Sequence, residues 1–71
     1  MRELRLVNRV RELRFAKGEL TQKDLADRLG VSRQTINAIE SGRYSPSLEL
    51  ALLLCAAFEV AVEDVFTIEG G

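Results

Sequence analysis

Apolar residues recur three and four positions apart through the first 43 residues, which is the spacing of helices with one buried face. The stretches are preceded by residues suited to cap a helix N-terminus, which are Asn8, Thr21 and Ser32. They end at glycines, which suit the left-handed backbone of a helix C-terminus, at Gly18, Gly30 and Gly42. The pattern predicts three short helices that end near Lys17, Leu29 and Ser41.

The second and third helices are expected to follow each other closely. Asp24 stands three residues after Thr21, which is a capping-box spacing, and Gly30 and Val31 form the turn before the Ser32 cap. Two short capped helices joined by a glycine turn and preceded by a basic helix make a helix-turn-helix, with a core over about 21–41.

The second half of the chain predicts two more helices. Pro46 and Ser47 mark the start of one that ends near Phe58, and a short one fits residues 62–65. The segments RELRLV and VFTIE, near the two ends of the chain, can each form a short strand and pair. The expected fold class is therefore all-α with five helices, with short terminal strands that can pair.

Residues 48–58 predict a helix that is apolar on every side, because Glu49 is its only polar residue. At about 100° per residue, the face expected to enter the core holds Leu48, Ala51, Leu52, Leu54, Cys55 and Phe58. The opposite side holds Leu50, Leu53 and Ala57, which we expect a second copy of the chain to cover. The helix is too short for a membrane span of about 20 residues. A dimerisation region over about 48–69 follows.

Composition excludes several classes of function. A chain of 71 residues is expected to form one domain over 1–71. It has no histidine and only one cysteine, so zinc sites, Ser-His-Asp triads and disulfides lack their parts. No enzyme, metal, cofactor or small-molecule ligand is expected. Cys55 is expected to be an inert buried hydrophobe, and without an apolar leader the protein is expected in the cytoplasm.

The net charge of −1 conceals an uneven distribution along the chain. Residues 1–43 hold all ten Lys and Arg residues with six acids, a net charge of +4, whereas residues 44–71 hold five acids and no base. A basic part and an acidic part favour one face for a polyanion and another kept away from it.

The third helix is expected to point Ile36 and Ile39 inward, which leaves four other residues outward: Arg33, Gln34, Asn37 and Ala38. Arginine can donate twice to guanine, glutamine or asparagine can pair with adenine, and a small alanine permits close approach to a base. The same chemistry also fits a solvated polar surface.

The segment LTQKDLADRLGVSRQTINAIESGRYSPSLE resembles the helix-turn-helix of the Cro and lambda-repressor type, the XRE family. The shared features are the Thr-Gln start, two glycines, the Ile-Glu-x-Gly end and the Pro-Ser-Leu that follows. The resemblance extends from about Val10 to Phe66 and implies a five-helix lambda-repressor-like DNA-binding domain. The segments VSRQTIN and PSLELAL are similar to those of small free-standing bacterial and archaeal regulators.

The resemblance also implies roles for individual residues. Base reading falls to Arg33, Gln34 and Asn37, with Ala38 beside them. Contacts with the DNA backbone fall to Gln22, Ser32, Thr35, Arg43 and Tyr44. Arg14 and Glu40 match a buried ion pair with a structural role. Glu19 departs from the family pattern, because it lengthens the turn before Thr21 and weakens the assignment of phosphate contacts to Arg9, Arg11 and Lys17.

Three functions fit these residues. The first is a homodimeric transcriptional regulator, in particular a repressor, that binds a palindromic operator in double-stranded DNA. The second is an antitoxin of the same fold that binds a toxin protein and autoregulates its operon. The third is a protein-interaction module that kept the fold without reading bases, which acidic or bulky apolar residues at the reading positions would favour. Arg33, Gln34 and Asn37 are neither, so the sequence favours the first function.

Overall fold

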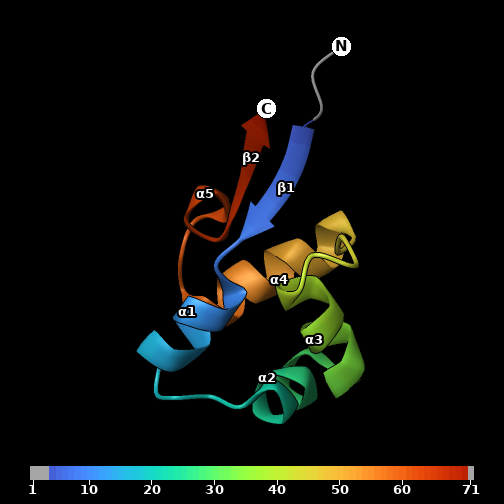
Figure 1. Cartoon of the computed structure of the whole chain (residues 1–71). Coiled ribbons are helices and arrows are strands. Elements are labelled where there is room, and N and C mark those ends of the chain that lie inside the picture. The colour runs from blue at the N-terminus through green and yellow to red at the C-terminus, as the bar shows by residue number, and fades with distance from the viewer. Residues whose placement is uncertain (1–3, 71) are drawn as a thin grey trace.

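The computed structural model describes residues 4–70, which form five helices and two strands (Figure 1). In chain order the elements are β1 (Leu4–Asn8), α1 (Val10–Ala16), α2 (Gln22–Leu29), α3 (Arg33–Glu40), α4 (Leu48–Phe58), α5 (Val62–Val65) and β2 (Phe66–Gly70). The five predicted helices and the pairing of the terminal strands are therefore confirmed, while Arg2 and Glu3 of the predicted first strand lie outside the described residues. None of the helices in the described residues is long and apolar enough to cross a membrane.

The ends of α2 and α3 are formed by local hydrogen bonds. Thr21 Oγ1 accepts a hydrogen bond from the backbone N–H of Asp24 at 3.0 Å, and Asp24 Oδ2 accepts one from the N–H of Thr21 at 3.2 Å. Gly30 ends α2 with a φ of 71°, and Ser32 Oγ accepts from the N–H of Thr35 to begin α3. These bonds satisfy N–H groups that a helix leaves unpaired at its start, so the sequence determines both helices locally.

The predicted cap of α1 is one residue too early. Asn8 is the last residue of β1, and Arg9 is the N-cap of α1; Arg9 makes no side-chain cap bond, because a guanidinium cannot accept a hydrogen bond. Asn8 still serves this junction: its Oδ1 accepts from the N–H of Val10 at 3.1 Å, and its Nδ2 donates to the carbonyl oxygen of Ile39 at 2.8 Å. The Asn8 side chain thereby joins the strand, the start of α1 and the end of α3.

The two strands form an antiparallel pair that extends beyond the helices and carries both ends of the chain (Figure 1). In the register Leu6 lies opposite Ile68 and Asn8 lies opposite Phe66. The backbone N–H of Arg9 donates to the carbonyl oxygen of Val65 at 2.8 Å, which continues the pairing to the first residue before α1. The sheet therefore fixes α1 and α5 beside each other.

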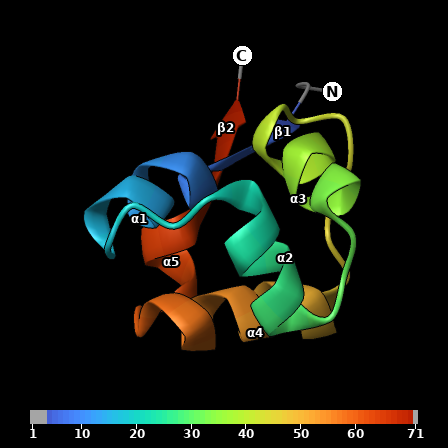
Figure 2. The ribbon, with the colours of Figure 1, turned by 90° about the horizontal axis from the view of Figure 1, so that it is seen from below.

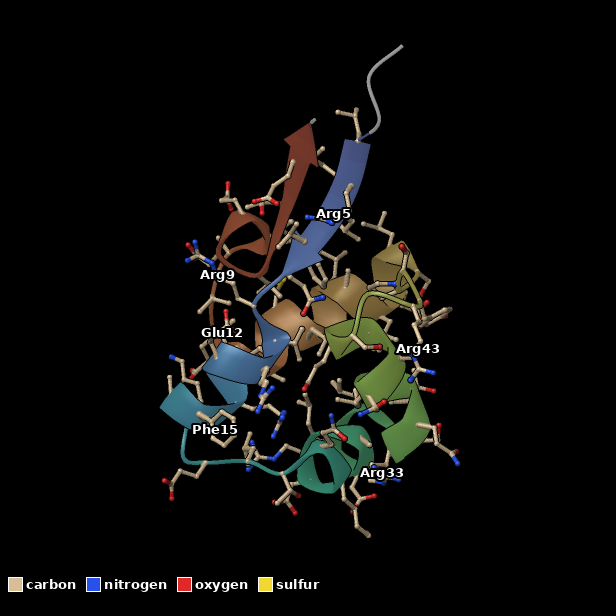
Figure 3. All side chains as sticks on the ribbon, in the orientation of Figure 1. Arg5, Arg9, Glu12, Phe15, Arg33 and Arg43 are labelled. Carbon is tan, nitrogen blue, oxygen red and sulfur yellow. The ribbon has the colours of Figure 1, made fainter. Side chains whose placement is uncertain are left out.

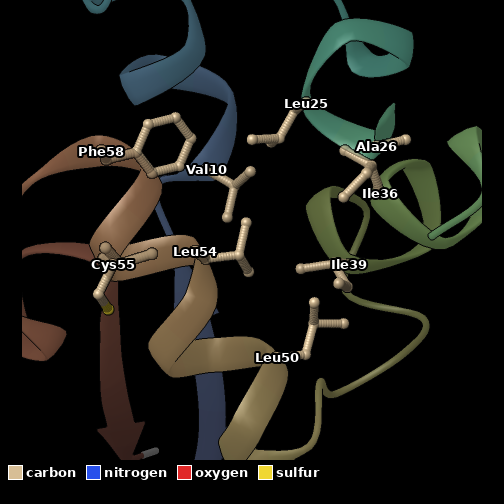
Figure 4. Packing of buried hydrophobic residues seen from close by; sticks show 10 residues of the cluster. Val10, Leu25, Ala26, Ile36, Ile39, Leu50, Leu54, Cys55 and Phe58 are labelled. Atoms are coloured by element: carbon tan, nitrogen blue, oxygen red, sulfur yellow. The ribbon is translucent and has the colours of Figure 1, made fainter. Parts of the chain in front are cut away.

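The helices enclose one apolar core. Its largest fully buried side chains come from α1, α2, α3, α4 and α5, and Figure 4 shows most of them meeting between the helices: Val10, Leu25, Ile36, Ile39, Leu54, Phe58 and Val65. Viewed from below, α4 lies across the base of the helices with α2 above it (Figure 2). The helix-turn-helix therefore packs against α4 through α2.

The orientation of α4 differs from the prediction. Leu50 was expected on the side opposite the core but is only 8% exposed and belongs to the core, and Ala57 packs against it. Leu48 and Leu52 were expected inside but are 75% and 50% exposed. The reason is that an almost uniformly apolar helix has no polar side to indicate its rotation. Of the predicted interface residues, only Leu53 is exposed, at 44%.

Candidate nucleic-acid interface

The two sides of α3 differ sharply in burial and chemistry. Ile36 and Ile39 are 0% and 1% exposed and anchor the helix in the core. On the other side Arg33 and Gln34 are exposed, and Asn37 and Ala38 are half-buried. The structure thus places the four predicted base-reading residues on one side of one anchored helix.

Ser32 and Thr35 lie together at the start of α3. Their hydroxyl groups are 2.9 Å apart, and Ser32 Oγ also accepts the N–H of Thr35 at 3.1 Å. A hydroxyl has one hydrogen and two lone pairs, so this arrangement uses part of its hydrogen-bonding capacity and leaves the remainder for a phosphate oxygen. The start of a helix also favours anions, because its N–H groups and its dipole present positive charge.

The loop after α3 brings Arg43 back along the helix. Arg43 Nη2 donates to Asn37 Oδ1 at 2.9 Å, and Arg43 Nε donates to Ser41 Oγ at 3.0 Å. The sequence-based interpretation assigned Arg43 to the DNA backbone and missed its bond to Asn37. No sequence signal reveals this contact, since it depends on the path of the loop.

Tyr44 follows Arg43 in the loop after α3. Its ring is part of a residue that is 47% exposed, and it borders an open hollow of about 410 Å³ between the turn before α3 and the start of α4. Thr35, Glu49 and Leu53 border the same hollow. Tyr44 therefore shares this hollow with Thr35, and both residues carry a predicted contact with the DNA backbone.

The Arg14–Glu40 pair lies beneath the polar side of α3. Arg14 Nε and Glu40 Oε2 are 2.6 Å apart, Arg14 Nη2 and Glu40 Oε1 are 3.0 Å apart, and the two side chains are 8% and 7% exposed. Arg14 Nη1 also donates to the carbonyl oxygen of Leu20 at 2.8 Å. The guanidinium thus joins α1 to the end of α3 and to the turn before α2, which is the structural role that the resemblance implied.

Gln22 connects this buried pair to the exposed residues of α3. Its Nε2 donates to Glu40 Oε1 at 3.1 Å, and its Oε1 lies 3.5 Å from both Arg33 Nη1 and Asn37 Nδ2. We call these six residues the α3 network: Arg14, Gln22, Arg33, Asn37, Glu40 and Arg43. Its members come from three helices and one loop, so their meeting depends on the tertiary fold.

The basic residues at the start of α1, which are its N-cap Arg9 and Arg11, are divided between two sides of the molecule. Arg11 borders an open cleft of about 350 Å³ together with Gln22, Asn37 and Glu40, so it shares a surface with the α3 network. Phe15 lies at the same cleft, with the Arg11 guanidinium 6.0 Å from the centre of its ring. Figure 3 shows Arg9 on the other side, beside α5, and Arg33 and Arg43 along α3. Arg9 is therefore separate from the candidate interface.

Other chemistry is limited in the described part of the chain. It holds no group of three or more His, Cys, Asp or Glu residues placed to bind a metal ion. Cys55 is a free thiol in the core, and burial raises its pKa, so the reactive thiolate is disfavoured. This environment fits the predicted inert hydrophobe.

The fold and the geometry of α2 and α3 define a helix-turn-helix DNA-binding domain. The model of the helix-turn-helix family of the XRE type matches residues 10–65, so the chain belongs to that family. The chain is 60% identical over 50 residues to an uncharacterized HTH-type transcriptional regulator of Methanocaldococcus jannaschii, a match that covers 70% of this chain and 76% of the relative. It is 52% identical over 62 residues to the uncharacterized HTH-type transcriptional regulator YgzD of Bacillus subtilis, with 87% and 92% of the two chains covered.

Solved structures show the same fold. The restriction-modification controller protein C.AhdI from Aeromonas hydrophila is 36% identical, with a TM-score of 0.70 over 78% of this chain and 82% of the other. A putative DNA-binding protein from Bacteroides fragilis has a TM-score of 0.76 over 87% of this chain and 98% of the other, and at 24% identity it is similar in fold alone. The chain is thus a transcriptional regulator with a helix-turn-helix DNA-binding domain, a non-enzymatic class.

Proposed function

We propose that this protein is a homodimeric repressor that binds a palindromic operator with α3 in the major groove of double-stranded DNA. The observation that carries the proposal is the outward side of α3, where Arg33, Gln34 and Asn37 stand on a helix fixed by Ile36 and Ile39. Such side chains match the donor and acceptor pattern of base edges, and a helix of this size fits the major groove.

The roles of the residues follow from where they lie. Arg33, Gln34 and Asn37 read bases, and the small Ala38 permits the helix to approach them. Ser32 and Thr35 at the start of α3, and Gln22 at the start of α2, contact phosphates on one side of the groove. Arg43 contributes positive charge after α3, and Tyr44 contacts the backbone farther along. The helix-turn-helix core over 21–41 therefore supplies most of the interface.

The second half of the chain supports self-association. The exposed side of α4 carries an apolar surface that we call the α4 stripe, composed of Leu48, Leu52, Leu53 and Ala56. Monomers rarely leave a continuous apolar surface exposed without a partner. A two-fold dimer covers the stripe with its own copy and places two α3 helices about 34 Å apart, on successive major grooves. The dimerisation region is thus within 48–69, with the α4 stripe in place of Leu50 and Ala57.

Charge separation is consistent with this arrangement. The elements α4, α5 and β2 belong to the half of the chain with five acids and no base, while α1, α2 and α3 belong to the basic half. A dimer formed through α4 therefore joins the two copies by their acidic halves and leaves the basic halves for the polyanion. Such a protein acts where the DNA is, in the cytoplasm of a prokaryotic cell, and represses by occupying its operator.

The α4 stripe also suits the second function, an antitoxin that binds a toxin protein, since a foreign helix covers apolar side chains as well as a second copy does. Sedimentation of the purified protein separates the two cases. A stable dimer at micromolar concentration supports the repressor, and a monomer that binds operator DNA weakly favours a different partner for the stripe.

Selection of bound sequences from random duplex DNA, at a stated salt concentration, tests the main proposal. The expected result is an inverted repeat whose half-sites are one helical turn apart. Uniform enrichment of all sequences would contradict base reading by α3. A single half-site without an inverted repeat would retain base reading and contradict the dimer.

A further inference from the structure

The side-chain amide of Asn37 is held at both of its ends. Its Oδ1 accepts from Arg43 Nη2 at 2.9 Å, and its Nδ2 lies 3.5 Å from Gln22 Oε1 as a donor. An amide has two acceptor lone pairs and two N–H groups, so one acceptor and one donor stay free. One acceptor and one donor are what the amino group and N7 of adenine require for a bidentate pair.

The direction of the Gln22 amide follows from its neighbour Glu40. A carboxylate only accepts hydrogen bonds, so the NH₂ of Gln22 must face Glu40 Oε1, 3.1 Å away. The oxygen of Gln22 must then face Asn37, one turn earlier in α3. Glu40 cannot turn aside easily, because Arg14 holds both of its oxygens in a buried site. The buried charge thereby determines which end of Gln22 is presented to Asn37.

At the other end of the α3 network, Arg43 imposes the same orientation on the Asn37 amide. A guanidinium only donates, so the oxygen of Asn37, and not its NH₂, must face Arg43. The bond from Arg43 Nε to Ser41 Oγ, at 3.0 Å, holds the plane of the guanidinium. A carboxylate at one end and a guanidinium at the other therefore permit only one orientation of the Asn37 amide between them.

We propose that Arg43 is a positioning residue for sequence specificity: together with Gln22 it fixes the orientation of the Asn37 amide before DNA binds. The proposal rests on the proposed function, in which Asn37 reads a base. A freely turning amide presents its donor and acceptor in either order, whereas a fixed amide presents one order and thus favours adenine on one strand at one position. Fixing the amide in advance also reduces the side-chain entropy lost on binding.

The decisive variant is Arg43→Lys, because it keeps the positive charge and removes the planar fork that reaches Asn37 and Ser41 together. Attraction to phosphates should persist, so we expect the salt dependence of binding to stay close to wild type. The preference for the base read by Asn37 should fall by about tenfold. Arg43→Ala should lose that preference too and should also lower the salt slope by about one.

Two further variants serve as references for the effect of Arg43→Lys on base preference. In Asn37→Ala the base preference should be lost at one operator position and kept at the others, which identifies the position that Asn37 reads. Arg9→Lys, on the far side of the molecule, makes the same chemical change outside the interface and should leave all preferences unchanged (Figure 3). Thermal unfolding of each variant shows that the altered binding is measured on folded protein.

The outcomes separate this proposal from the proposed function. If wild-type protein prefers no base, the proposed function fails. If wild type prefers a base that Asn37→Ala no longer distinguishes, and Arg43→Lys keeps the full preference, only the positioning role of Arg43 is overturned. Equal weakening of all sequences by Arg43→Lys would also overturn it, because that is the result of a simple phosphate contact.

A measurement without DNA gives an independent readout. In the free protein the side-chain N–H₂ group of Asn37 should be as ordered as the backbone by NMR relaxation, and Arg43→Lys should lower that order. The exposed amide of Gln34, on the same helix, is the mobile reference. If the Asn37 amide of wild type is as mobile as that of Gln34, the proposed orientation is absent.

Discussion

Arg14 and Glu40 show how single residues connect the core of this protein to its candidate nucleic-acid interface. The pair is almost fully buried, and its guanidinium and carboxylate bind each other. The guanidinium also donates to the Leu20 carbonyl, and the carboxylate also accepts from Gln22. Ion pairs of this kind gain stability only while both partners are present, because a lone buried charge keeps its desolvation penalty. The pair therefore makes the position of α3 depend on α1.

Replacing Glu40 by glutamine should destabilise the protein by about 3–5 kcal/mol, since it leaves the Arg14 guanidinium buried without a countercharge. This is a large fraction of the roughly 5–15 kcal/mol by which domains are stable. Chemical denaturation measures the change. Asp27→Asn is the control, because it breaks the exposed Lys23–Asp27 pair and should change stability little. An unchanged unfolding midpoint for Glu40→Gln would contradict a buried ion pair.

At the scale of elements, the start of α2 depends on the charge of Asp24. Asp24 Oδ2 accepts a hydrogen bond from the backbone N–H of Thr21, and this bond, with the nearby Thr21 hydroxyl, holds the pKa of the Asp24 carboxyl below its ordinary value of 3.8. A carboxyl with a lowered pKa stabilises the folded state above its unfolded pKa, and the contribution is lost as the pH falls through the folded pKa.

Asp24→Asn should therefore lower the unfolding temperature at pH 7, because the amide at this position carries no charge for the helix start to stabilise. Below the ordinary carboxyl pKa, wild type loses the same contribution, so the two unfolding temperatures should converge. Thermal unfolding from pH 7 down to pH 2 measures the difference. A difference that stays constant over this range would show that the charge of Asp24 contributes nothing.

The end of α4 has a backbone conformation that suits glycine better than the residue present. Glu59 is the C-cap of α4 and has a φ of 57°, in the left-handed region. Residues other than glycine pay about 1–2 kcal/mol there; glycine avoids this strain, but its larger unfolded-state entropy offsets part of the gain. Glu59→Gly should thus stabilise the protein by about 0.5–1 kcal/mol.

Denaturant unfolding of Glu59→Gly tests this, with Glu63→Gly as its matched control. Glu63 lies in the first turn of α5, in a helical conformation that glycine disfavours, so its replacement should destabilise. If both variants are destabilised to the same extent, the left-handed conformation of Glu59 carries no strain.

These elements show which parts of the structure the sequence could predict. The bounds of α2 and α3 depend on bonds within four residues, such as Thr21 with Asp24, so local spacing predicts them well. The rotation of α4 could not be predicted, because an apolar helix has no polar side and the burial of Leu50 depends on where α2 and α3 pack. The bonds of Asn37 to Gln22 and Arg43 join distant parts of the chain, and residue types alone do not specify them.

At the scale of the whole molecule, we compare two exposed apolar surfaces of the described residues as places for a second copy. One is the α4 stripe, and the other is the end of the sheet, where Leu4 and Ile68 are 69% and 60% exposed. The stripe lies on the longest helix, beneath the helix-turn-helix, whereas the sheet extends away from the helices (Figures 1 and 2). The dimer that we propose uses the α4 stripe and places the two α3 helices on adjacent major grooves.

Leu53→Glu should therefore convert the proposed dimer into a monomer, since it places a charge in the centre of the proposed apolar contact, which excludes water. Ile68→Glu is the matched control: it makes the same kind of change at a somewhat more exposed position of β2 and should leave the proposed dimer intact. Sedimentation equilibrium measures the association of both variants, and thermal unfolding establishes that each remains folded. The monomer should bind a single half-site as wild type does and the inverted repeat far more weakly, because the second half-site no longer adds to the first. The opposite pattern, with Ile68→Glu monomeric and Leu53→Glu dimeric, would place the interface on the sheet.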